Sequence, residues 1–286
     1  MSAFDSRLRA ARPDLAAETL RGQVTADRFV HGVRHTVTEP LLDLTATADP
    51  GGVRETQLLF GERFTAYETR EDGLIWGQAS RDGYVGYVAA TGLGPARPEG
   101  HLITALSSHV YPRPDMKSRP TGELTLGAEV EVAGTSGDFA RLRNGGFVPR
   151  GHVVPIAGDM AAHALRFAGA PYLWGGRSVR GLDCSALIQL AGLMAGIDIP
   201  RDSDMQEALI GEALPVREKL RRGDLIFWGG HVGILRDGST LIHANAHHMS
   251  VAVEPLSEAA MRIAGAGGGR ISARRRIDPA TARPWR

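Results

Sequence analysis

Turn residues divide the first half of the chain into short runs that favour β-strands. The stretches "TQLLFGERFTAYETREDGLIWGQAS" and "DGYVGYVAA" hold strand-sized runs at a spacing typical of a small barrel. After "GLGPARPEGHL" a similar order returns, with "LTLGAEV" and "GGFVPRGHV" in the places of "LLFGERF" and "GYVGYV". This degenerate internal repeat predicts two small all-β barrels, over residues 34–98 and 99–156.

The regions on either side of the repeat have a different pattern. Residues 1–33 contain the amphipathic stretch "DLAAETLRGQV", which predicts a helical lead-in to the first barrel. From residue 157 onward, runs with helical spacing come first, and β-prone runs such as "GDLIFWGG" and "HVGILRDGSTLIHA" follow. Helices followed by consecutive strands predict an α+β domain over residues 157–286.

The charge balance and the hydropathy of the chain argue against nucleic acids and membranes as binding partners. The chain has 33 Lys and Arg against 32 Asp and Glu, so no field of one sign draws it to nucleic acid or to an anionic membrane. No stretch reaches the roughly 18 uninterrupted apolar residues that suggest a spanning helix. The first residues carry alternating charge without the apolar core of an export signal. We therefore expect a cytoplasmic protein that binds neither nucleic acid nor membrane.

The single cysteine, Cys184, stands at the start of a run with helical spacing of apolar residues, and Asp183 is suited to cap that helix. One cysteine excludes an internal disulfide. Unpaired backbone N–H groups and the positive dipole end of a helix start favour the reactive thiolate. From position alone, a buried and inert cysteine remains the alternative.

The stretch "HVGILRDGSTLIHA" predicts a hairpin that offers a base for this thiol. A three-residue loop over residues 236–238 places Leu235 opposite Ser239. The ladder then brings His231 directly opposite His243 on one face, where one imidazole orients the other. A two-residue loop would put the histidines on opposite faces. Two histidines that merely fill a half-polar face are the structural alternative.

Metal binding is the competing use of these histidines. His247 and His248 follow His243 in "HANAHH", but no local spacing matches a known zinc pattern. We expect His247 and His248 to be solvated loop residues, and His163 to be a surface or capping histidine. The sequence predicts no metal site and no cofactor.

Five stretches of the C-terminal half occur at family-like spacing: "YLWGGRSVRGLDCSAL", "PRDSDMQ", "GDLIFW", "HVGIL" and "LIHA". From Asp159 to Ile277 the chain thereby resembles the NlpC-type cysteine peptidases, a papain-like group that cleaves bacterial peptidoglycan peptides. The two upstream β units resemble bacterial SH3-like domains, and the combination resembles γ-D-glutamyl-L-diamino acid endopeptidases of the dipeptidyl-peptidase VI type. The resemblance implies an α+β papain-like catalytic domain preceded by two small all-β SH3-like barrels.

The resemblance also assigns roles at the reaction centre. Cys184 becomes the nucleophile, His231 the general base and His243 the orienting residue. Backbone N–H groups at the nucleophile would stabilise the oxyanion, and a tyrosine hydroxyl would help to hold it or the substrate carbonyl. The residues assigned near the nucleophile are Tyr172, Asp183 and Ser185.

For substrate, the resemblance implies a murein peptide, L-Ala-γ-D-Glu-diamino acid, with a free amine on its alanine. Asp202 and Ser203 of "RDSD" would bind that amine, because a desolvated ammonium needs a carboxylate and acceptors. A helix N-cap is their alternative role. The first SH3-like unit would add an acidic residue and a tyrosine. The remaining substrate-binding candidates are Glu62, Tyr87 and Trp174, with Glu55 and Tyr84 as rivals of the first two.

Two further functions stay open at this point. A catalytically inert protein would use its barrels to bind wall peptides, although the intact cysteine and histidines argue against it. An acyltransferase on the same fold would require an apolar, membrane-facing segment, which the sequence does not show. The resembling family is largely exported, whereas the near-neutral charge and the lack of an evident signal favour recycling of liberated wall peptides in the cytoplasm.

Overall fold

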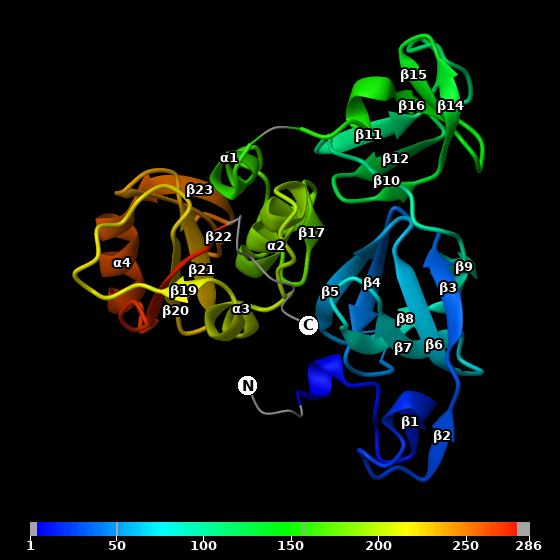
Figure 1. Ribbon diagram of the computed structural model, residues 1–286, viewed down its shortest axis with the longest axis horizontal. Helices are drawn as coiled ribbons and strands as arrows, with labels where there is room; N and C mark the ends of the chain where they lie inside the picture. Colours follow the sequence, from blue (N-terminus) through cyan, green and yellow to red (C-terminus); the bar gives the residue numbers. More distant parts are fainter. Residues whose placement is uncertain (1–4, 50, 157, 279–286) are drawn as a thin grey trace. The chain divides into compact units, whose positions relative to one another are not determined.

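The computed structural model describes residues 5–49, 51–156 and 158–278. These residues divide into two compact units, Met1–Val154 and Pro155–Arg286 (Figure 1). The first unit is built almost entirely of strands, and the second combines helices with a sheet. Nowhere in the described ranges is a helix both long enough and apolar enough to cross a membrane.

The N-terminal segment differs from the predicted helical lead-in over residues 1–33. Its described part forms short pieces: the 3₁₀ helices Ser6–Leu8 and Glu18–Leu20, and the parallel strands β1 (Leu15–Ala17) and β2 (Arg28–Val30). All residues of β1 are buried, and Leu15 and Ala17 cluster with Trp76 of the first barrel. Burial against that neighbour outweighs the weak helical preference of the segment, which sequence spacing alone does not reveal.

The first barrel is a sheet of seven strands within the described residues, in the order β5-β4-β8-β7-β6-β3-β9. Side chains alternate between core and solvent along strands such as β4. The enclosed core includes Leu44, Leu58, Phe64 and Val88. The strands are β3 (Val33–Val37), β4 (Leu41–Thr45), β5 (Arg54–Leu59), β6 (Arg63–Thr69), β7 (Leu74–Ala79), β8 (Val85–Ala89) and β9 (Leu93–Pro95), with a 3₁₀ helix at Ala90–Gly92.

The rest of the first unit is a second β body with its own core around Ile103, Leu142 and Val148. Its elements are β10 (His101–Leu102), β11 (Ser107–Val110), β12 (Gly122–Thr125), β13 (Glu129–Val130), β14 (Val132–Ser136), β15 (Phe139–Leu142), β16 (Phe147–Pro149) and a 3₁₀ helix at Arg150–His152. Unlike the first barrel, its described strands pair in small sheets of two or three.

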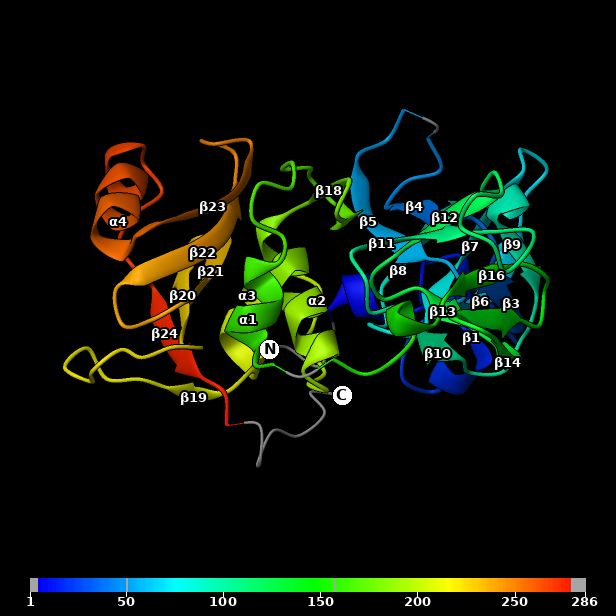
Figure 2. The same ribbon diagram turned by 90° about the horizontal axis from the view of Figure 1, so that it is seen from above.

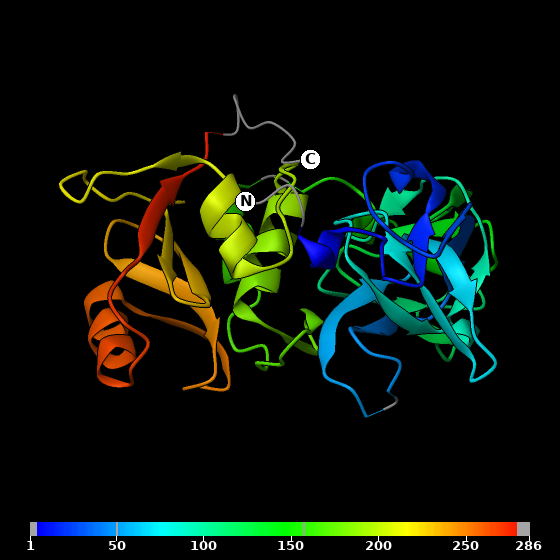
Figure 3. The same cartoon turned by 90° about the horizontal axis from the view of Figure 1, so that it is seen from below.

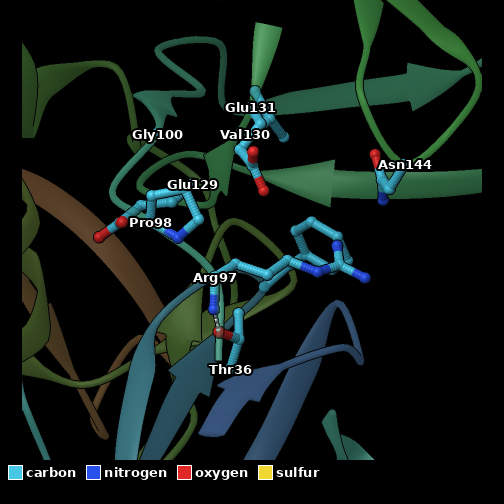
Figure 4. A pocket seen from close by; sticks show the side chains of 10 residues that line it. Thr36, Arg97, Pro98, Gly100, Glu129, Val130, Glu131 and Asn144 are labelled. Carbon is cyan, nitrogen blue, oxygen red and sulfur yellow. Dashed lines mark hydrogen bonds between the residues drawn. The ribbon is translucent and has the colours of Figure 1, made fainter. Parts of the chain in front are cut away.

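Ion pairs join the two β bodies of the first unit. Arg81 contacts Glu62 of the first barrel at 3.0 Å and Glu129 of the second body at 2.8 Å. A cavity of about 20 Å³ lies between the bodies, lined in part by polar residues (Figure 4). There Thr36 Oγ1 accepts a hydrogen bond from the Arg97 backbone N–H at 2.8 Å. The volume suits about one water molecule, so this cavity is not a substrate site.

The second unit has a sheet in the order β19-β24-β20-β21-β22-β23, counted over its described residues. Helix α4 lies on one face of this sheet and helices α1, α2 and α3 lie on the other (Figures 2 and 3). The helices are α1 (Met160–Leu165), α2 (Cys184–Met194), α3 (Ser203–Leu209) and α4 (Leu256–Gly265). The strands are β17 (Arg177–Ser178), β18 (Gly181–Leu182), β19 (Glu212–Ala213), β20 (Leu225–Trp228), β21 (His231–Leu235), β22 (Thr240–Asn245), β23 (Ser250–Pro255) and β24 (Ala273–Arg276).

The hairpin of β21 and β22 exists, but its register is shifted by two residues from the predicted one. Ile234 pairs with Ile242, which leaves residues 237–239 in the loop instead of 236–238. Asp237 accounts for the difference, because its carboxylate accepts hydrogen bonds from the backbone N–H groups two and three residues further on, at 2.9 and 2.8 Å. A shift of two residues leaves every side chain on its predicted face.

Candidate active site

Cys184 is the first residue of α2, as predicted. Asp183 caps the helix, because its carboxylate accepts a backbone hydrogen bond from the first turn at 2.8 Å. The cysteine is 7% exposed, and the backbone N–H groups of Val232 and Ser185 hydrogen-bond its sulfur. Since Val232 directly follows His231, the thiol lies beside the start of β21.

The protonation of this site differs from the thiolate that a helix start alone favours. Burial raises the pKa of Cys184 to about 12, and the neighbouring Asp183 carboxylate contributes to the rise. Burial also lowers the pKa of His231 to about 3, with a further contribution from His243. Both groups are therefore neutral at rest, and the thiolate forms only as the proton moves to a base.

The two histidines contact each other diagonally rather than directly across the hairpin. His231 Nε2 and His243 Nδ1 are 2.8 Å apart, and His243 is completely buried. Gly233 faces His243 across the strands, where a Cβ atom would lie 3.0 Å from the Cβ of the histidine. The glycine thus leaves room for the imidazole, and a diagonal contact stands in place of the predicted direct one.

Two residues that the sequence did not suggest extend the histidine pair. His243 Nε2 lies 2.7 Å from Glu254 Oε1, and Arg262 donates to both Glu254 oxygens at 2.6 and 2.7 Å. Glu254 belongs to β23, where it pairs with Leu241. Testing the register of "LIHANAHHMSVAVE" as a second hairpin would have placed this glutamate on the face of His243.

Tyr172 lies close enough to the thiol for their charges to interact. Burial raises the pKa of Tyr172 to about 12, and Cys184 is the second cause of the rise. The tyrosine is held from β23, because its backbone N–H donates to the Met249 carbonyl at 2.9 Å and Pro171 bridges Ser250. Tyr172 therefore lies within electrostatic reach of Cys184, and its role at the oxyanion stays a prediction.

Asp183 and Ser185 point their side chains at Arg201 rather than into an open cleft. Arg201 donates to the two Asp183 oxygens at 2.9 and 2.6 Å and to Ser185 Oγ at 2.9 Å. Arg201 is 1% exposed, so this is a buried ion pair. The pair fixes the "DCS" turn to the segment that precedes α3.

Asp202 and Ser203 follow that arginine directly, which brings the start of α3 beside the start of α2. Asp202 stands at the N-cap position, yet its side chain makes no capping hydrogen bond. Both residues are partly exposed. The Asp202 carboxylate therefore does not cap α3, which was the alternative role for this residue. Trp174, near Tyr172 in the chain, is 62% exposed.

Within the first barrel, the acidic and tyrosine candidates for substrate binding differ in their burial and in their hydrogen-bond partners. Glu62 is 1% exposed and paired with Arg81 at 3.0 Å, which leaves it poorly suited to bind a substrate amine. Tyr87 accepts a hydrogen bond from Arg12 at 2.8 Å. The rivals form a pair of their own, because Tyr84 donates to Glu55 at 3.4 Å and Glu55 is partly exposed.

The other histidines were considered above as metal ligands, and two of them have contacts or burial that the structure defines. His248 contacts Asn245 in the turn before β23 through its ring and backbone nitrogens, at 3.0 and 2.9 Å. His163 is 1% exposed inside α1, contrary to the predicted surface or capping position, because α1 packs against α2. In the parts of the chain that the structure describes, no three His, Cys, Asp or Glu residues are grouped to hold a metal ion.

A buried cysteine at a helix start, a histidine pair on the neighbouring strands and a sheet packed on that helix are the parts that a cysteine peptidase needs: a thiol nucleophile, a base and a residue that orients the base. The comparisons with known proteins agree. Residues 169–265 match the NlpC/P60 family, and residues 44–93 match the bacterial dipeptidyl-peptidase Sh3 domain. The chain therefore carries an NlpC/P60 catalytic domain behind an SH3-like domain, and it is a cysteine peptidase.

Curated relatives match different parts of the chain. The "Dipeptidyl-peptidase 6" of Lysinibacillus sphaericus is 37% identical over 99 residues, which are 33% of this chain and 35% of that protein. The "Gamma-D-glutamyl-L-lysine dipeptidyl-peptidase" of Bacillus subtilis is 27% identical over 232 residues, 72% of this chain and 77% of that protein. The chain thus spans about a third of the first relative's length and most of the second's.

A solved structure supports the fold over a longer range. The crystal structure of an NlpC/P60 family protein from Bacillus cereus has a TM-score of 0.71 and covers 85% of this chain and 99% of that one. Its sequence identity is 20%, so the likeness concerns the fold alone.

Proposed function

We propose that this peptidase hydrolyses the bond between γ-D-glutamate and a diamino acid in peptidoglycan-derived peptides that carry a free N-terminal L-alanine. The contact that carries the proposal is the 2.8 Å approach of His231 Nε2 to His243 Nδ1 beside the thiol at the start of α2. The name of the Bacillus subtilis relative, a γ-D-glutamyl-L-lysine dipeptidyl-peptidase, supports the choice of bond.

Cys184 acts as the nucleophile and His231 as its base. The sulfur attacks the γ-carbonyl carbon as its proton passes to His231, and the new oxyanion lies near backbone N–H groups of α2 and the Tyr172 hydroxyl. The C–N bond then breaks, and the imidazolium returns the proton to the leaving amine. Water, deprotonated by the same histidine, hydrolyses the thioester. His243 orients the base throughout.

The free amine of the substrate requires negative charge nearby. Asp202 and Ser203 are partly exposed beside the nucleophile segment, and the Asp202 carboxylate is not used as a cap. We place them at the terminal ammonium. Of the acidic candidates on the first barrel, Glu55 fits this role better than Glu62, because its carboxylate is partly exposed. Tyr84 donates to Glu55 but is itself only 2% exposed, whereas Tyr87 is partly exposed.

Three broader expectations belong to the same proposal. The second β body, residues 99–156, is a second SH3-like barrel with its own core, against which Phe60 of the first barrel packs. The protein is cytoplasmic and recycles liberated wall peptides. Its substrates are short free peptides rather than intact murein.

Defined peptides test the proposal directly. The protein is incubated with L-Ala-γ-D-Glu-diaminopimelate, the same peptide acetylated at its amine, and the stem linked to muramic acid, and the products are identified by mass spectrometry. We expect release of diaminopimelate from the free peptide alone. The acetyl group removes the charge of the amine, and the loss of its charge-assisted hydrogen bond to a partly exposed carboxylate costs about 1.5–3 kcal/mol. Equal kcat/KM for free and acetylated peptides would contradict amine recognition but not the cysteine mechanism.

A further inference from the structure

We propose that Glu254 is a positioning residue for the catalytic base, acting through His243 and held in place by Arg262. The inference rests on the proposed roles of Cys184 and the two histidines. It assigns a task to a carboxylate that lies outside the three residues of the proposed reaction centre.

The contacts form a continuous chain across three strands and one helix: β21, β22, β23 and α4. His231 Nε2 lies 2.8 Å from His243 Nδ1, and His243 Nε2 lies 2.7 Å from Glu254 Oε1. Arg262, on α4, donates to the same Oε1 at 2.6 Å and to Oε2 at 2.7 Å. This two-point contact fixes the plane of the carboxylate and aims Oε1 at the imidazole.

The hydrogen bonds that join His231, His243 and Glu254 determine which nitrogen of each imidazole carries the proton. A carboxylate only accepts hydrogen bonds, so His243 must donate from Nε2, and its Nδ1 is then the acceptor. His231 accordingly donates from Nε2, which leaves its Nδ1 lone pair free to take the proton of the thiol. The opposite arrangement would protonate His231 Nδ1 and remove the base. Glu254 thus selects the productive tautomer of a residue that it does not touch.

The surrounding charges keep Glu254 ionised for this task. Burial would raise the pKa of Glu254, but hydrogen bonds from Arg262 and His243 outweigh it and lower the pKa to about 2. His248 of the preceding turn lies 3.9 Å from Glu254 Oε1, and Glu258 of α4 interacts with Arg262. Burial, against the pull of Glu254, lowers the pKa of His243.

A purely structural ion pair between β23 and α4 is the competing explanation. It would make Glu254 matter for folding, without any dependence on His243. Glu254→Gln separates the two, because an amide of the same shape lacks the charge and presents an N–H₂ group either to the imidazole or to Arg262. Glu258→Gln is the matched control, since it removes an exposed carboxylate charge that also acts on Arg262 but leaves the contact between Glu254 and His243 in place.

The experiment measures kcat, KM and the pH profile of the full-length protein and its variants, with thermal unfolding to verify the fold. We expect Glu254→Gln to lower kcat about 10- to 100-fold with KM nearly unchanged. We also expect the acid limb of kcat/KM to move to lower pH, because Glu254 raises the pKa of His231. Glu254→Asp should recover part of the loss, and Glu258→Gln should have no effect.

Coupling to His243 provides the decisive comparison. In a His243→Asn background, the amide oxygen of the new residue still accepts from His231, and nothing remains for Glu254 to orient. Glu254→Gln should then cost nothing further. The same fold-loss in both backgrounds, or an unshifted pH profile, would overturn the proposal.

A measurement that needs no peptide substrate tests the role of Glu254 independently of the proposed function. The rate at which iodoacetamide alkylates the sole cysteine at pH 7 reports proton transfer from Cys184 to His231. It should fall several-fold in Glu254→Gln and stay unchanged in Glu258→Gln. An unchanged rate in Glu254→Gln counts against the positioning role, whereas a wild-type protein that cleaves none of the peptides contradicts only the substrate assignment.

Discussion

Cys184 concentrates the proposed chemistry in one sulfur atom, so its removal is the sharpest test at the scale of a residue. Cys184→Ala should abolish turnover without unfolding the protein, and His231→Ala should cost nearly as much, at least about 10³-fold, because such residues act as a unit. His243→Ala should cost less, since it only orients the base. The measurement is kcat/KM with circular dichroism as the control. Substantial hydrolysis by Cys184→Ala would refute the covalent route.

The protonation of the same residue leads to a second prediction. Because burial raises the pKa of Cys184 to about 12 and lowers that of His231 to about 3, the neutral pair persists at pH 7. The rate of alkylation by iodoacetamide follows the thiolate fraction. It should therefore keep rising from pH 6 to pH 9 in the free protein. A rate already level from about pH 5 would indicate a preformed ion pair instead.

At the scale of the elements, the buried contact of Arg201 with Asp183 ties the start of α2 to the segment before α3. Arg201→Met should destabilise the protein by about 3–5 kcal/mol, because it strands a buried carboxylate. Urea unfolding measures the loss. Pairing it with Asp183→Asn should restore part of the stability, since the stranded charge is then gone. A loss below about 1 kcal/mol for Arg201→Met would show that water reaches the carboxylate.

The elements also show what sequence patterns can and cannot predict. Side-chain faces in a hairpin depend only on whether a register shift is even or odd, so His231 and His243 were placed together despite the shifted loop. The loop itself was set by the Asp237 side chain, which strand spacing does not encode. Glu254 was not predicted, because it lies on the strand that follows the last of the family-like stretches, in a hairpin whose register was not tested. The N-terminal segment depended on burial against Trp76, a contact far away in sequence.

At the scale of the whole molecule, amine recognition separates the two acidic candidates of the first barrel. If Glu55 binds the substrate amine, Glu55→Gln should lower kcat/KM for the free-amine peptide about 10- to 100-fold, because a charge-assisted hydrogen bond is lost. The acetylated peptide should be affected far less. Glu62→Gln should instead lower the thermal stability, because it leaves Arg81 only partly compensated. The reverse pattern would return the role to Glu62.

The ion pairs of Arg81 also limit how the two β bodies can be exchanged by recombination during evolution. The Arg81 guanidinium joins Glu62 in one β body to Glu129 in the next, and Arg63 also reaches Glu129 at 2.8 Å. A recombination event that exchanged only the second body would strand charges on both sides of the break. The two bodies are therefore not interchangeable modules: we expect descendants of this gene to keep or lose them as a single block.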